Sequence, residues 1–175
     1  MIIGVEELKK YIDFKDLNDD KVKMQLESIE SLIRSYTHNN FQNRNVRVIC
    51  SSSNNKLNGH SPYLKVGDTV QISQSHYNDG LYVINEITDD TITLDKDLFN
   101  NEFNMVTKIE YPTAIVQGVI NLMKWDVNSR DKVGIQSESI SRHSVTYFNQ
   151  DGSNSTVGYP TSLLGFLEPF KKARF

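Results

Sequence analysis

The sequence predicts an α+β protein. We expect a helical core of long antiparallel helices, with a C-terminal hairpin and a short helix, that carries an inserted small antiparallel β module. Near both ends of the chain, apolar residues recur three and four positions apart, as on one face of a helix. Between these segments they alternate with polar residues in short runs separated by turn residues, as in strands. Residues 1–45 and 111–175 should therefore form the core, and residues 46–110 a barrel-like β module.

The first segment predicts two helices. A short one is marked by Val5 and Leu8 and ends at the polar stretch 16–20. A longer one begins near Asn18 or Asp19, since either side chain can accept a hydrogen bond from an exposed backbone amide. The pair Asn39-Asn40 should end this helix, because Asn tolerates the left-handed conformation. The apolar stripe of the longer helix consists of Val22, Leu26, Ile29, Ile33 and Tyr36.

Residues 46–110 predict about five short strands, enough for a small barrel or a compact sheet. The turn Asn78-Asp79-Gly80 predicts a hairpin, because Asp-Gly accepts positive φ at both central positions. Asp89-Asp90 predicts a second turn, and the polar run 51–61 predicts a loop. The single cysteine, Cys50, follows an apolar run and is interpreted as a small core residue.

The third segment predicts a helix that begins at Pro112, where the missing amide costs nothing. Gly118 lies within it and costs about 1 kcal/mol relative to Ala, so we expect close contact with another element there. A strand-like run, a loop over 149–158 and a final short helix follow. The apolar stripe of the first of these helices consists of Ile115, Val116, Val119, Leu122 and Met123.

The composition predicts neither a nucleic-acid-binding surface nor a membrane segment. Net charge is −3, from 19 basic and 22 acidic residues. Tyr63, Tyr77 and Tyr82 are candidates for stacking on bases, but few basic residues accompany them, so we interpret them as filling the core or an inter-subunit seam. No window approaches the roughly 20 apolar residues that span a bilayer. The compact basic cluster of the chain is Lys171, Lys172 and Arg174.

No convergent set of reactive side chains predicts an enzyme, a metal site or a cofactor. The nine glycines show no phosphate-binding spacing, and no serine occupies a strand–turn–helix elbow. The histidines His38, His60, His76 and His143 fall in different segments, without the spacing of metal ligands. Asp89, Asp90, Asp95 and Asp97 lack the residue order of a calcium-binding loop and are interpreted as turn formers.

Several short motifs follow one another along nearly the whole chain. They are Ile33-Arg34-Ser35-Tyr36-Thr37-His38-Asn39-Asn40-Phe41, Asn78-Asp79-Gly80-Leu81-Tyr82, Tyr111-Pro112, the run from Ser137 to Tyr147, Gly158-Tyr159-Pro160, Leu163-Leu164 and the run from Phe166 to Lys172. In this order the motifs resemble the head–tail connector family of long-tailed bacteriophages, also called head-completion or adaptor proteins. The β module departs from the pattern, since shorter members of the family lack or abbreviate it.

The resemblance implies a structural virion protein assembled in the cytoplasm of a bacterial host. It implies a ring, usually of about twelve copies, that binds the portal protein at the head–tail junction and extends the DNA channel. The ring would offer a docking surface to a tail or neck-completion protein. Viral double-stranded DNA would pass without specific binding, as suits a mildly acidic chain. The alternatives are a tail-completion or neck stopper protein of the same virion, and a small β-barrel binding module.

The carboxyl end is the expected docking element. Residues 149–158 are rich in Asn, Ser and Gly and predict a mobile loop. The apolar helix after it is too short to be stable alone. Either it folds back on its own subunit, or the loop acts as a hinge and the helix inserts against the portal or a neighbouring subunit. The predicted interface consists of Tyr159, Leu163, Leu164, Phe166, Leu167, Phe170, Lys171, Lys172 and Arg174.

Overall fold

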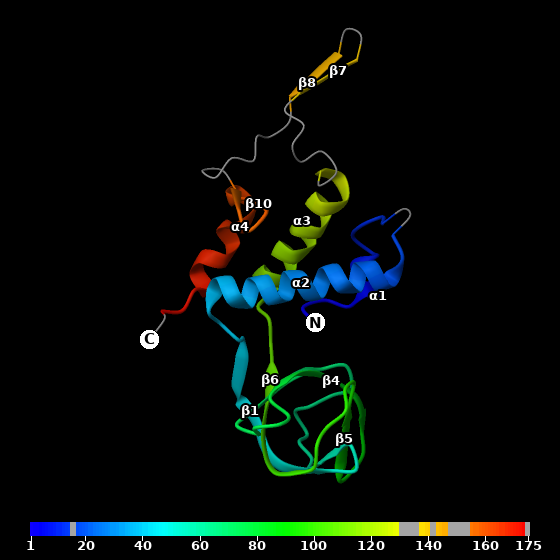
Figure 1. The fold of residues 1–175 in the computed structure, drawn as a ribbon, viewed down its shortest axis with the longest axis vertical. Coiled ribbons are helices and arrows are strands. Elements are labelled where there is room, and N and C mark those ends of the chain that lie inside the picture. Colours follow the sequence, from blue (N-terminus) through cyan, green and yellow to red (C-terminus); the bar gives the residue numbers. More distant parts are fainter. Residues whose placement is uncertain (15–16, 130–136, 141–142, 147–154, 174–175) are drawn as a thin grey trace. The chain divides into compact units, whose positions relative to one another are not determined.

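The structure, a computed structural model, describes residues 1–14, 17–129, 137–140, 143–146 and 155–173. The chain divides into two compact units. The barrel unit comprises residues 40–111, and the terminal unit comprises residues 1–39 together with 112–175. Each unit has its own architecture (Figure 1).

The barrel unit is a closed antiparallel barrel of six strands in the order β1-β2-β5-β4-β3-β6. Its interior is filled by inward-facing side chains that alternate with outward-facing ones, as the period of two in a strand requires. The strands are β1 (Gln42–Ser53), β2 (Lys56–Asn58), β3 (Thr69–Ser73), β4 (Gly80–Ile87), β5 (Thr91–Leu94) and β6 (Asn101–Ile109). The most deeply buried side chains are Leu57, Val70, Ile72, Ile84, Ile92 and Val106.

β1 closes the barrel because it pairs with two different strands. Its last residues, from Ser51, pair with β2 along one side, while residues between Gln42 and Ser52 pair with β6 along the other. The register of β1 against β6 shifts twice, and such irregularities bend a strand and increase its twist. β1 is therefore shared between two neighbours around the circumference, which leaves no free sheet edge.

The polar run 51–61 was predicted as a loop, and that prediction is wrong. It holds the end of β1, a tight turn and all of β2. Asn54 and Asn55, at the turn, have φ of 50° and 64°, as a two-residue hairpin requires. Ser52 and Leu57 are the inward-facing members of the two strands, at 3% and 0% exposed. The sequence does not show an alternation of apolar and polar residues in these strands, because one of the inward-facing residues is a serine.

The predicted hairpin at 78–80 is present between β3 and β4, but its backbone differs from the expectation. Positive φ falls on Gln74 and His76 rather than on Asp79 and Gly80. The connection is longer than a two-residue turn because Asn78 is turned inward and is 1% exposed. The second predicted turn, at Asp89-Asp90, joins β4 to β5 and is closed by hydrogen bonds between Thr88 and Thr91.

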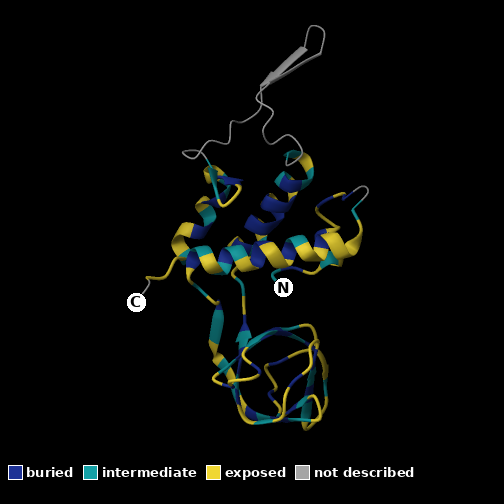
Figure 2. Ribbon diagram, in the orientation of Figure 1, coloured by how far each residue is buried: buried dark blue, intermediate teal, exposed yellow. Residues whose placement is uncertain are grey.

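The terminal unit contains two helices of more than two turns. Around them lie short elements, of which β7 pairs with β8 and β9 pairs with β10. Figure 2 shows a buried side on both α2 and α3, and each of the two helices also has exposed residues. The elements are α1 (Val5–Leu8), α2 (Asp19–Thr37), α3 (Thr113–Ser129), β7 (Ser137–Ile140), β8 (His143–Thr146), β9 (Ser155–Thr156), β10 (Tyr159–Pro160), α4 (Thr161–Leu164) and the 3-10 helix η2 (Gly165–Phe170).

The ends of α2 follow from side-chain and backbone chemistry. The side-chain oxygen of Asn18 accepts a hydrogen bond from the amide of Lys21 at 2.9 Å, which caps the first turn as predicted. The helix ends one residue before the predicted Asn pair, at His38, which adopts the left-handed conformation with φ 50°. In the described part of the chain, no helix has the length and apolar character of a membrane span.

The predicted fold class is wrong. The structure holds a closed six-stranded barrel and few, mostly short helices, instead of a helical core of long antiparallel helices with a small β insertion. α3 is apolar on more than one side, so it contacts α2, α4 and η2 instead of pairing along its length with α2 alone. Residues 51–61, which the sequence predicts as a loop, form part of the barrel wall. The β structure is therefore a fold in its own right.

Candidate docking surface in the terminal unit

The carboxyl-terminal segment begins at an anchor on α3. Tyr159 is 4% exposed, and its hydroxyl donates a hydrogen bond to the carboxylate of Asp126 at 2.7 Å. Its ring lies 5.5 Å, between centroids, from that of Trp125. A buried tyrosine with its hydroxyl satisfied fixes both the position and the orientation of the backbone. Tyr159 therefore sets where α4 starts.

α4 and η2 pack on α3 through apolar side chains. Leu164 and Leu167 are 1% and 0% exposed, whereas Leu163, Phe166 and Phe170 are half-buried. A Cβ placed on Gly118 would overlap the ring of Phe166, so only glycine leaves room for this contact. The prediction of a close neighbour at Gly118 is confirmed, and the neighbour is Phe166.

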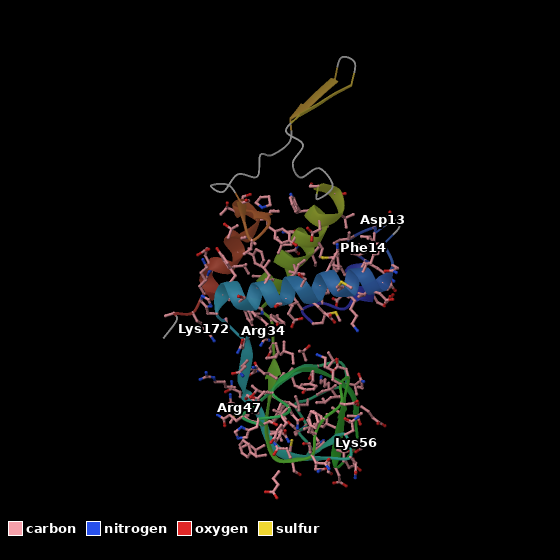
Figure 3. The ribbon with its side chains drawn as sticks, in the orientation of Figure 1. Asp13, Phe14, Arg34, Arg47, Lys56 and Lys172 are labelled. Carbon is pink, nitrogen blue, oxygen red and sulfur yellow. The ribbon has the colours of Figure 1, made fainter. Side chains whose placement is uncertain are left out.

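Backbone bonds join the end of the segment to the last turn of α2. The amide of Lys172 donates to the carbonyl of Thr37 at 2.8 Å. The side-chain amide of Asn39 donates to the carbonyl of Phe170 at 3.2 Å. Figure 3 labels Lys172 on the side of the terminal unit where α2 ends. Cationic side chains near the C-terminal end of a helix such as α2 interact favourably with the negative end of the helix dipole.

Three side chains add an exposed polar cluster at the same place. The ammonium of Lys171 donates to the carboxylate of Glu168 at 2.8 Å and to the hydroxyl of Tyr36 at 3.0 Å. It also lies 4.1 Å from the centroid of the Tyr36 ring, within cation–π distance. Hydrogen bonds from Lys171 and then Tyr36 hold the pKa of the Glu168 carboxyl below its usual value, and the pKa of Lys171 is raised by the same contacts.

A surface groove of about 500 Å³ lies beside this cluster. Its apolar residues are Leu32 and Val157, and its basic end is formed by Lys171, Lys172 and His38. Leu32 and Val157 also line a second hollow, of about 310 Å³, that reaches Asp126 and Tyr159. Both hollows are lined in part by α2, which contributes Leu32 to each of them.

Val157 lines both hollows and has a strained backbone conformation. It is 54% exposed, although its side chain is apolar, and its φ of 48° is a conformation that β-branched residues rarely adopt. Together with Gly158, at φ 81°, it forms the turn between β9 and β10. Because backbone strain of this kind clusters at functional sites, Val157 is a candidate contact residue.

Of the predicted interface residues, Arg174 lies outside the described residues, and the others fall into three groups. The buried group, packed against its own subunit, consists of Tyr159, Leu164 and Leu167. The half-buried group consists of Leu163, Phe166 and Phe170, and the group exposed at the groove consists of Lys171 and Lys172. Of the predicted loop 149–158, residues 149–154 also lie outside the described residues. Sequence reasoning missed Leu32, Tyr36, His38 and Val157 as groove residues. Only Val157 gave a signal, as an isolated apolar residue in a polar loop.

Among the described residues, no group of three or more His, Cys, Asp or Glu side chains is placed to hold a metal ion. Cys50 lies in the barrel wall at 7% exposed, and burial raises the pKa of its thiol to about 11. A thiol with so high a pKa is a poor nucleophile at neutral pH.

Comparison with known proteins adds no assignment: no protein-family model matches the chain, and no curated protein is similar to it.

Proposed function

We propose that this chain is a structural virion protein of a tailed bacteriophage that forms the head–tail connector ring beneath the portal. In this role it extends the DNA channel, offers a docking surface to the tail, and acts without catalysis, metal or cofactor. The order of motifs along nearly the whole chain supports the proposal. The structural observation that carries it is the groove along α2, with its apolar middle and its basic end at Lys171 and Lys172.

The groove suits an extended acidic segment of the portal protein. Leu32 and Val157 offer apolar contact, while the exposed ammonium groups of Lys171 and Lys172 attract carboxylates. The polar cluster of Tyr36, Glu168 and Lys171 is exposed, so its contacts are weak in water and can be exchanged for contacts with a partner. Basic side chains at one end also steer an acidic partner during encounter.

The charge of the chain agrees with a conduit for DNA. The barrel unit has six basic and nine acidic residues, so it repels phosphates rather than holding them. A ring subunit that gripped the DNA backbone would oppose its passage. The proposed partners are thus the portal protein, neighbouring copies in a ring of about twelve, and a tail or neck-completion protein.

Electron microscopy of the full chain mixed with the portal protein of the same genome tests the proposal. We expect a closed ring of added density on the portal. Lys171→Glu with Lys172→Glu should weaken portal binding by about tenfold or more, because two charges at the groove are reversed. The matched control is Lys21→Glu with Lys23→Glu, which makes the same charge change at the other end of α2 and should bind normally.

Failure of the chain to bind the portal, or a single bound copy, would refute the connector ring. Equal binding by both charge-reversal variants would show that the docking surface is not the groove. A ring that forms only on a tail-side protein would favour the alternative of a tail-completion or neck stopper protein. The closed barrel fits loosely with the other alternative, a small β-barrel binding module.

A further inference from the structure

Three loops meet at one end of the barrel and expose aromatic side chains. They are the β1–β2 turn, the β3–β4 loop 74–79 and the β5–β6 loop 95–100. Tyr77 is 75% exposed and Phe99 is 67% exposed, and their ring centroids are 6.2 Å apart. Phe103, at the start of β6, is 39% exposed. We call this surface, with Tyr77, Phe99 and Phe103, the aromatic end of the barrel.

The two loops that carry Tyr77 and Phe99 are held together by the buried side chain of Asn78. Its amide nitrogen donates to the carbonyl of Phe99 at 2.9 Å, and its oxygen accepts from the amide of Phe99 at 2.8 Å. The same nitrogen also donates to the side-chain oxygen of Asn104 at 3.0 Å, and Asn104 is 0% exposed. Such a satisfied buried network rigidifies its surroundings. The exposed rings therefore stand on a fixed base and lose little entropy on binding.

The charges around the aromatic end have one prevailing sign. Four exposed carboxylates lie in or beside its loops, at Asp79, Asp95, Asp97 and Glu102. Two lysines lie in or beside the same loops, Lys96 in the β5–β6 loop and Lys56 directly after the β1–β2 turn, and the ammonium of Lys96 already donates to the carbonyl of Leu81 at 3.0 Å. The surface is thus aromatic in the middle and acidic at its rim.

We propose that the aromatic end is a docking surface for a basic, extended segment of a partner protein. Arginine and lysine side chains bind both to aromatic faces and to carboxylates, and this surface offers both within a small area. Tyr and Arg are also the residues that most often dominate protein interfaces. A nucleic acid is disfavoured, because the acidic rim repels its phosphates. This inference rests on the barrel unit alone and does not depend on the connector proposal.

Selection from a random peptide library displayed on phage, with the full chain immobilised, tests the surface without any portal protein. We expect the selected peptides to be enriched in Arg and Lys and depleted in Asp and Glu. A synthetic peptide of the consensus, followed by fluorescence anisotropy, should bind Tyr77→Ser with Phe99→Ser at least about tenfold more weakly than the unaltered chain. Both side chains are exposed, so the double variant should keep its fold.

The matched control is Tyr63→Ser with Val66→Ser, which removes side chains that are 67% and 62% exposed from the β2–β3 connection. It should bind the peptide normally, and replacing the basic residues of the peptide by Gln should abolish binding. The proposal is overturned if no peptide is selected, if the consensus is not basic, or if the two double variants bind equally. Binding of single-stranded DNA at the same residues, in competition with the peptide, would also overturn it.

Discussion

Replacing Gly118 by Ala should destabilise the terminal unit, although alanine is the better helix former. Alanine in place of glycine favours a helix by about 0.8–1.0 kcal/mol. Against this, the added methyl group would overlap the ring of Phe166, and overpacking of this kind costs about 1–3 kcal/mol. We expect a net loss of about 1 kcal/mol in the free energy of unfolding. Either the Phe166 ring or η2 must shift to make room for the methyl group.

The sign of the effect should reverse when Phe166 is removed. In a Phe166→Ala background, Gly118→Ala should stabilise by about 1 kcal/mol, since only the helix preference remains. The two results give a coupling of about 2 kcal/mol, within the range found for residues in contact. Urea unfolding followed by the fluorescence of Trp125, the single tryptophan of the chain, measures this because the ring of Trp125 lies beside Tyr159. Stabilisation by Gly118→Ala in both backgrounds would refute the packing of Phe166 on α3.

Three further predictions concern buried groups. Tyr159→Phe removes the hydrogen bond to Asp126 and should cost about 1 kcal/mol in the same urea assay, without loss of secondary structure by circular dichroism. Asn104→Ala breaks the buried network of the barrel unit and should cost about 1–3 kcal/mol, whereas Asn85→Ala, at an exposed position, should change stability by less than about 0.5 kcal/mol. Burial raises the thiol pKa of Cys50 to about 11, so little of the thiol is ionised between pH 7 and 9. In this pH range Cys50 should react with a thiol reagent far more slowly in the folded chain than in urea. Equal rates would contradict its burial.

The sequence predicts local elements of this protein better than their assembly. The apolar stripe of α2 and the cap at Asn18 are local features, and both are present. The contact at Gly118 was also predictable, because an unfavourable glycine in a helix needs a reason. Barrel closure is different. It depends on the pairing of β1 with β6, between residues far apart in the chain, and on bulges that no spacing pattern marks.

The candidate sites could not be predicted either, because their residues come together only in the folded chain. Lys171 and Lys172 stand out in the sequence as a basic cluster, but Leu32 and Tyr36 belong to the groove only because α2 happens to end beside η2. Likewise, Tyr77 and Phe99 are 22 positions apart and meet because Asn78 joins their loops. A polar residue in a turn motif gives no sign that it will be buried. The inward rotation of Asn78 could not have been predicted from the hairpin signal that it forms.

The contacts of the carboxyl-terminal segment indicate which of its parts can change partner. Leu164 and Leu167 are fully buried, and exposing each would cost about 1.5–3 kcal/mol, in addition to the contact of Phe166 with Gly118. By contrast, the side chain of Lys171 makes exposed polar contacts that water replaces at little cost, whereas the backbone of Lys172 is bonded to the carbonyl of Thr37. The side chain of Lys171 can therefore exchange its contacts at low cost, while the buried leucines keep α4 and η2 packed on α3.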